Sequence, residues 1–228
     1  MGMYMRVFSV ESPSALDAFE GRNESTTLRA LCKLLGHHFT ATIVRSKEEF
    51  ETALVYLTSI NPAQIPKGQC KWPLCLHIAA HGDEDGLSIG AEDAEWKYLA
   101  KQISLFIKNN DYPGPVLVVI SACGAGQQQV TKELENLAAK QEFEPPAYLF
   151  VTDGDEDGDV DWRDAVVAWS IFYHNIGHAV LEKKYEIMTI MDKIRLAGAG
   201  TLKYFRWDGK HKKFKAYTPK CDEHEHAS

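Results

Sequence analysis

The two segments HIAAHGDEDGLSIG (residues 77–90) and VLVVISACGAG (residues 116–126) decide the fold predicted for this chain. Each overlaps a run that is apolar apart from one residue, LCLHIAA at 74–80 and VLVVIS at 116–121. Apolar runs without polar alternation are typical of strands in a parallel sheet that helices cover on both faces. We therefore predict two buried parallel strands, each ending just before the polar part of its segment.

Outward from these segments, predicted strands and helices alternate along the chain. Further strands are predicted at 6–11, 39–44 and 147–152, and helices at 26–35, 47–57, 92–108, 127–140 and 162–199. Residues 12–25 and the acidic stretch 153–161 are expected to be loops, and 202–207 with 215–217 form a predicted hairpin. This order predicts an α/β fold, a doubly wound, mostly parallel sheet flanked by helices, with a C-terminal hairpin. We expect a single domain over 1–220 and a frayed tail at 221–228.

Composition narrows the class of protein. The chain has 228 residues, of which 45% are hydrophobic, and a net charge of −7. An acidic protein is a poor partner for phosphate backbones, so nucleic acid is not expected. The chain has five cysteines, an odd number, and no signal peptide precedes them. We therefore expect free thiols in the reducing cytoplasm. No apolar run approaches the ~20 residues of a membrane helix, so no membrane partner is expected.

Two reactive side chains follow the two buried strands. His81 comes directly after the first, and Cys123 follows the second. If these strands are neighbours, both side chains project into one crevice, because the carboxyl ends of parallel strands meet at one edge of a sheet. An imidazole beside a thiol removes its proton as it attacks. The N–H groups of Gly82 and Cys123 could then form an oxyanion hole.

These segments resemble the His-Gly and Ala-Cys signatures of the caspase-like cysteine peptidase superfamily. The second segment is especially similar to the Ser-Ala-Cys-x-x-Gly motif of its CHAT branch. The resemblance implies that His81 is the general base and acid and Cys123 the acyl-enzyme nucleophile of an endopeptidase. It implies a protein or peptide substrate, regulation by a partner or by processing, and no cofactor or metal. The superfamily usually works without a third catalytic residue.

Four further residues are candidates for substrate binding. The acidic stretch that contains Asp153 and Asp161 would favour a basic side chain at P1, the substrate residue before the scissile bond. Basic-specific relatives often carry Asp at the position of Ser121, whereas Arg22 lies where caspases hold an arginine that binds an acidic P1. The P1 preference therefore stays open at this point.

Less specific interpretations compete with catalysis. Cys123 could be a small buried apolar residue, and the chain could be a catalytically weak or inactive module that acts as a regulatory binding protein. The aspartates from 153 onward superficially resemble a calcium loop, but the twelfth position is Asp164 rather than Glu. A solvated loop is the better interpretation, and no metal site is predicted. His77, inside a strand, is expected to be a core histidine.

Overall fold

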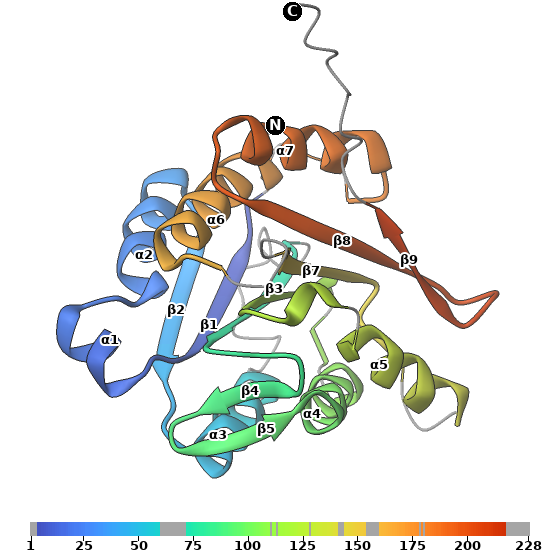
Figure 1. Cartoon of the computed structure of the whole chain (residues 1–228). Helices are drawn as coiled ribbons and strands as arrows, with labels where there is room; N and C mark the ends of the chain where they lie inside the picture. Colours follow the sequence, from blue (N-terminus) through green and yellow to red (C-terminus); the bar gives the residue numbers. More distant parts are fainter. Residues whose placement is uncertain are drawn as a thin grey trace, which may run out of the picture.

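The large sheet of the computed structural model confirms the predicted α/β class. The structure describes residues 4–59, 72–109, 111–112, 114–127, 129–140, 144–153, 160–177, 179 and 181–217. Within these ranges a seven-stranded sheet has the order β2-β1-β3-β6-β7-β8-β9 (Figure 1). Its strands are β1 (Arg6–Ser12), β2 (His38–Ile43), β3 (Leu74–Ala80), β6 (Val116–Ser121), β7 (Tyr148–Asp153), β8 (Thr201–Asp208) and β9 (Lys213–Tyr217). The first five in this order pair in parallel, and β8 and β9 add the antiparallel C-terminal hairpin.

Helices cover both faces of this sheet, as a doubly wound fold requires (Figure 1). One core cluster joins α2 (Glu24–Leu35), α6 (Trp162–Ile176) and α7 (Lys184–Leu196) to the sheet. The other joins α3 (Lys47–Thr58), α4 (Trp96–Asn109) and α5 (Gln129–Ala139) to the opposite face. Alternate residues of one strand enter different cores, Cys75 the first and Leu76 the second. The two central strands β3 and β6 are therefore buried on both sides, which explains their unbroken apolar sequence.

Helix ends follow the expected capping chemistry with one shift that affects the site. Ser46 caps α3, since its hydroxyl accepts a 3.1 Å hydrogen bond from the Glu49 amide. Helix α2, however, begins at Glu24 and not at residue 26, because Asn23 and not Ser25 is its N-cap, accepting from the Thr26 amide at 3.1 Å. The shift brings Glu24 into the first turn of α2.

Three sequence expectations were wrong. Residues 12–25 are not all loop, since they contain the short helix α1 (Ala15–Glu20), capped by Ser14. The start of the predicted helix 92–108 is instead β5 (Glu92–Glu95), which pairs with β4 (Gly86–Ile89) in a two-stranded hairpin. The predicted long helix 162–199 ends at Gly177, and α7 starts after the break. The tail 221–228 and the acidic residues 154–159 lie outside the described residues.

Candidate active site

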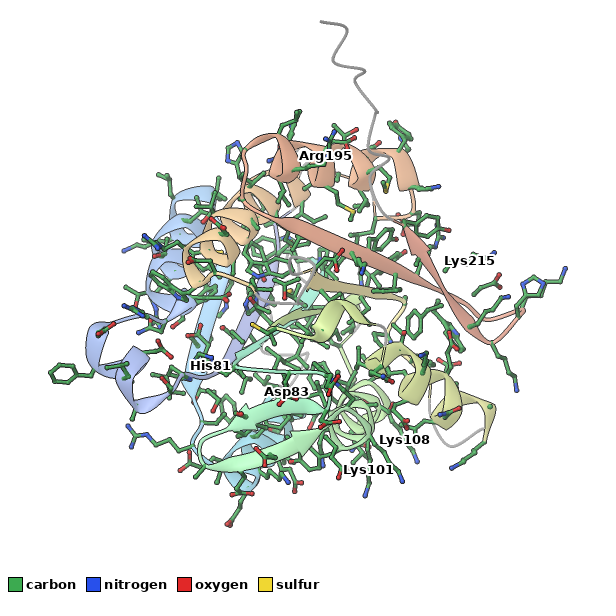
Figure 2. The ribbon with its side chains drawn as sticks, viewed as in Figure 1. His81, Asp83, Lys101, Lys108, Arg195 and Lys215 are labelled. Carbon is green, nitrogen blue, oxygen red and sulfur yellow. The ribbon has the colours of Figure 1, made fainter. Side chains whose placement is uncertain are left out.

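His81 and Cys123 follow equivalent positions of adjacent strands. Strand β3 pairs directly with β6, and Ala79 lies opposite Ser121 in the parallel register. His81 and Cys123 each come two residues after these partners, so both chains leave the sheet at the same edge. Figure 2 shows His81 just beyond β3, with Asp83 close by toward the β4-β5 hairpin. The strand adjacency on which the sequence argument depended is therefore present.

The loops that follow the two strands pack closely against each other. A Cβ atom on Gly82 would lie 2.6 Å from the Cys123 carbonyl oxygen. Gly124 has φ of +71°, and a Cβ there would lie 2.0 Å from the Asp83 carbonyl oxygen. Only glycine permits so close an approach of two backbones. The glycines after the two reactive residues thus allow the two loops to pack closely together.

The amides predicted for an oxyanion hole lie in this contact region. The hydrogen bonds that shape the loops come from other amides: Asp83 donates to the Gly86 carbonyl at 3.0 Å, and Ala122 donates to the Thr152 hydroxyl at 2.9 Å. The Gly82 and Cys123 amides take no part in these bonds. An oxyanion hole from these two N–H groups stays a prediction.

His81 is held by a carboxylate and not by the thiol. Its side chain is 58% exposed, and its Nε2 lies 2.5 Å from Oδ2 of Asp17 on α1. The Ser14 hydroxyl donates to the same oxygen. The hydrogen bonds from Ser14 and, next, from His81 hold the pKa of Asp17 below its ordinary value. Asp17 is thus an ionised partner for the His81 ring.

Cys123 is half-buried, and its sulfur contacts the backbone ahead of α6. The Val160 amide donates to Cys123 Sγ at 3.3 Å, and the Val160 carbonyl oxygen lies 4.0 Å from the sulfur. Among the hydrogen bonds of the described residues, none joins His81 to Cys123. Bonds between catalytic groups are often long or absent until substrate binds. Both residues line the same pocket.

The other described cysteines lie in a different environment. Cys32 and Cys75 are fully buried in the core between the sheet and α2 and α6. Burial raises the pKa of the Cys32 thiol to about 12 and that of Cys75 further still. Both stay protonated at neutral pH, and Cys123 is the one accessible thiol of the described residues.

A pocket of about 90 Å³ lies between His81 and Cys123 and extends to the ends of β1 and β6. This is several times the space that one water molecule needs. The lining residues come from the carboxyl ends of the parallel strands, from α1 and the start of α2, and from the start of α6: Glu11, Ser12, Pro13, Asp17, Arg22, Asn23, Glu24, Ala79, Ala80, His81, Ser121, Ala122, Cys123, Val160, Trp162 and Ala165. Three of these are carboxylic acids and one is a guanidinium, so the lining is acidic on balance.

A buried polar network forms the floor of the pocket. Ser121 Oγ donates to Glu24 Oε1 at 2.5 Å and accepts from the Trp169 indole at 2.8 Å. Glu24 Oε2 lies 2.8 Å from His77 Nε2, and His77 Nδ1 lies 2.9 Å from the Tyr173 hydroxyl. His77 is completely buried, in agreement with its assignment as a core histidine. The network fixes the carboxylate of Glu24 beneath Cys123.

Of the four predicted substrate-binding residues, Arg22 and Ser121 line the pocket. The Ser121 hydroxyl already donates a hydrogen bond to Glu24 and accepts one from Trp169. The Arg22 guanidinium pairs with Glu20 at 2.5 Å and reaches Asp17 at 3.9 Å, with half of its side chain exposed. Both residues therefore line the candidate pocket, and each already has partners within the protein.

Asp153 and Asp161 lie outside the pocket lining. Asp153 pairs with Lys203 of β8 at 2.6 Å. Asp161 caps α6 by accepting from the Arg163 amide at 2.7 Å, and this bond is the main cause of its lowered pKa. Asp161 directly follows Val160, which does line the pocket. The structure thus assigns structural partners to both acids.

Sequence reasoning missed Asp17, Glu11 and Glu24. Asp17 lies on a helix that was predicted as loop, although the Ser14-x-x-Asp17 spacing is the signature of a capped helix start. Glu11 lies near the end of β1 and Glu24 in the first turn of α2, and their contact with the pocket depends on the order of strands β1, β3 and β6. No local sequence pattern reports such a contact.

No group of three or more His, Cys, Asp or Glu side chains in the described ranges is placed to bind a metal ion. No helix in that part of the chain has the length and hydrophobicity to cross a membrane.

Comparison with known proteins gives a likeness in fold alone. No protein-family model matches the sequence. No curated protein matches it either. Solved structures that resemble the fold include a caspase-1 from Spodoptera frugiperda, at 12% sequence identity and a TM-score of 0.49, over 85% of this chain and 75% of that one.

Proposed function

We propose that this chain is a cysteine endopeptidase of the caspase-like superfamily, nearest in motif to the CHAT branch, with Cys123 as nucleophile and His81 as general base and acid. The observation that carries the proposal is the position of these two residues. They follow paired positions of adjacent parallel strands and line one pocket. The resemblance of the two sequence segments to the superfamily signatures supports the same roles.

The reaction that we propose needs only groups of this chain and water. In acylation, Cys123 Sγ bonds to the carbonyl carbon of the scissile peptide, and the thiol proton passes to His81. His81 gives this proton to the leaving amine as the carbon–nitrogen bond breaks. In deacylation, a water oxygen bonds to the same carbon, its proton passes through His81 to the sulfur, and the carbon–sulfur bond breaks. The Gly82 and Cys123 amides are the proposed donors to the oxyanion.

We further propose that the pocket accepts a basic P1 side chain. The carboxylate of Glu24 lines the pocket next to Ser121, and no ion pair joins it to Arg22 among the described residues. Arg22 would have to leave Glu20 and Asp17 before it could bind an acidic P1. Glu24, reaching position 121 from α2, supplies the negative charge that basic-specific relatives place on that residue. Asp153 and Asp161 would act only as part of the acidic surroundings.

Two contacts favour the alternative, a weak or inactive module that acts as a regulatory binding protein. His81 is hydrogen-bonded to Asp17, and the Val160 amide donates a hydrogen bond to the sulfur of Cys123. No hydrogen bond joins His81 to Cys123 among the described residues, so the two groups must approach each other before they react. Such a requirement also fits control of an active enzyme by a regulatory partner, in a reducing compartment such as the cytoplasm.

The test is cleavage of a mixed peptide library under reducing conditions by the wild type and by Cys123→Ala. We expect cleavage after basic residues that disappears in the variant. Cleavage that persists in Cys123→Ala would exclude this nucleophile. If the wild type cleaves nothing, and iodoacetamide alkylates Cys123 no faster than free cysteine, the regulatory module becomes the better assignment.

A further inference from the structure

The hydrogen bond between His81 and Asp17 fixes which ring nitrogen carries a proton. Asp17 is a carboxylate and can only accept, so the Nε2 atom that lies 2.5 Å from its Oδ2 must be the donor. In the neutral ring the proton on Nε2 leaves the lone pair on Nδ1. Nδ1 is therefore the atom that can take a proton from a thiol.

Asp17 is itself held in place by local bonds. Ser14 Oγ donates to Asp17 Oδ2 and accepts from the Asp17 amide at 3.1 Å. Arg22 approaches Oδ1 at 3.9 Å. The Asp17 side chain is only 16% exposed, although no residue of α1 is buried. The short helix α1 thus keeps its aspartate against the His81 ring without contributing to the core.

From this geometry we propose that Asp17 is a positioning residue for His81. It holds the ring in the Nε2–H tautomer, so that Nδ1 serves as the base for Cys123, and it stabilises the imidazolium formed when the thiol proton arrives. The inference deepens the proposed peptidase function and depends on it for the role of Nδ1. The tautomer itself depends only on the Asp17 contact. Three groups, one on α1 and two in the loops after β3 and β6, then act in series, from Asp17 through His81 to Cys123.

Other charged groups around His81 do not offer the same contact. Glu20 on α1 pairs with Arg22 at 2.5 Å and is not in the pocket lining. Glu11 and Glu24 line the floor of the pocket. Glu11 accepts a hydrogen bond from Ser9. Glu24 accepts one from Ser121 and bonds to His77 through its second oxygen. Asp83, after His81, accepts from the Asp85 and Gly86 amides. Glu20 is therefore the matched control: an acid on the same helix that shares Arg22 but does not touch His81.

The kinetic test compares Asp17→Ala, Asp17→Glu and Glu20→Ala with the wild type, using the peptide found in the library. We expect Asp17→Ala to lower kcat about 10- to 100-fold with KM within about 3-fold, because the aspartate acts on proton transfer and not on substrate binding. Asp17→Glu should recover part of the loss, and Glu20→Ala should stay within about 2-fold of the wild type. Equal losses in Asp17→Ala and Glu20→Ala would overturn the proposal, since the effect would then come from α1 as a whole.

A second measurement needs no peptidase activity. ¹⁵N NMR of histidine-labelled Cys123→Ala protein reports the tautomer of His81, and we expect Nε2–H in this background and a mixture of tautomers when Asp17→Ala is added. An unchanged tautomer would overturn the positioning role. Alkylation of Cys123 by iodoacetamide distinguishes a failure of the Asp17 inference from a failure of the proposed His81–Cys123 dyad. Slower reaction in His81→Ala but not in Asp17→Ala would refute the inference alone, whereas no effect of His81→Ala would refute the proposed dyad.

Discussion

The hydroxyl of Ser121 donates a 2.5 Å hydrogen bond to Oε1 of Glu24, joining the last residue of β6 to the first turn of α2. The contact lies two residues before Cys123 on the floor of the pocket. Glu24 is 6% exposed, and its second oxygen faces His77. A carboxylate so withdrawn from water interacts strongly with a cation that enters the pocket, because the local dielectric screens it weakly. The charge that selects a substrate can thus come from a residue remote in sequence from the nucleophile.

Replacing Glu24 should alter substrate choice. We expect Glu24→Gln to lower kcat/KM for a peptide with Arg at P1 by about 10-fold or more, and to change a norleucine peptide much less, because only the former loses an ionic partner. The measurement is the ratio of the two kcat/KM values. Ser121→Ala is the matched control, since it removes the hydrogen bonds with Glu24 and Trp169 and keeps the carboxylate. A wild type that prefers Asp at P1 would contradict this assignment and point to Arg22.

Thiol reactivity should distinguish Cys123 from the two buried cysteines. We expect iodoacetamide to alkylate Cys123 in the native protein at least ~100-fold faster than Cys32 or Cys75, whose thiols burial keeps protonated and out of contact with reagent. Peptide mass spectrometry after a timed quench gives the rate at each residue. The same reaction in denaturant is the control and should bring the three rates together. Comparable native rates at Cys75 and Cys123 would mean that the core opens readily.

An alanine at Gly82 should damage catalysis more than folding. The new Cβ would lie 2.6 Å from the Cys123 carbonyl oxygen, so the two loops must separate. We expect kcat/KM to fall about 100-fold or more through loss of the oxyanion donors, with a cost of roughly 1–3 kcal/mol in the free energy of unfolding. Gly209→Ala, where the nearest atom would lie 3.7 Å away, is the control and should leave kcat/KM unchanged. Full activity in Gly82→Ala would show that these loops do not form the oxyanion hole.

The central strands and the two reactive residues could be predicted from sequence because the signals are local. The bounds predicted for β3 and β6 agree with the structure, since both segments are apolar apart from His77 and Ser121 and lack polar alternation. The positions of Asp17 and Glu24 could not be predicted in this way. Asp17 lies on a six-residue helix with no buried face, so no apolar period marks it. Glu24 meets Ser121 only because β1 inserts beside β3, which is a property of the whole topology.

The pH dependence of stability should reveal the buried Glu11. This residue is 2% exposed, and burial raises its pKa above 4.5, a shift that the hydrogen bond from Ser9 partly offsets. Because the native state then holds the proton more tightly than the unfolded chain, stability contributed by Glu11 is present below pH 4.5 and is lost as pH rises through its native pKa. Each unit of pKa difference corresponds to about 1.4 kcal/mol.

We therefore expect Glu11→Gln to gain stability relative to the wild type as pH increases from 5 to 8, measured by urea unfolding at each pH. Glu95→Gln, which removes an exposed glutamate on β5, is the control for the loss of one charge. If both variants show the same dependence of stability on pH, burial of Glu11 does not govern that dependence. Ser9 and His77 then fully compensate the cost of burying the Glu11 carboxylate.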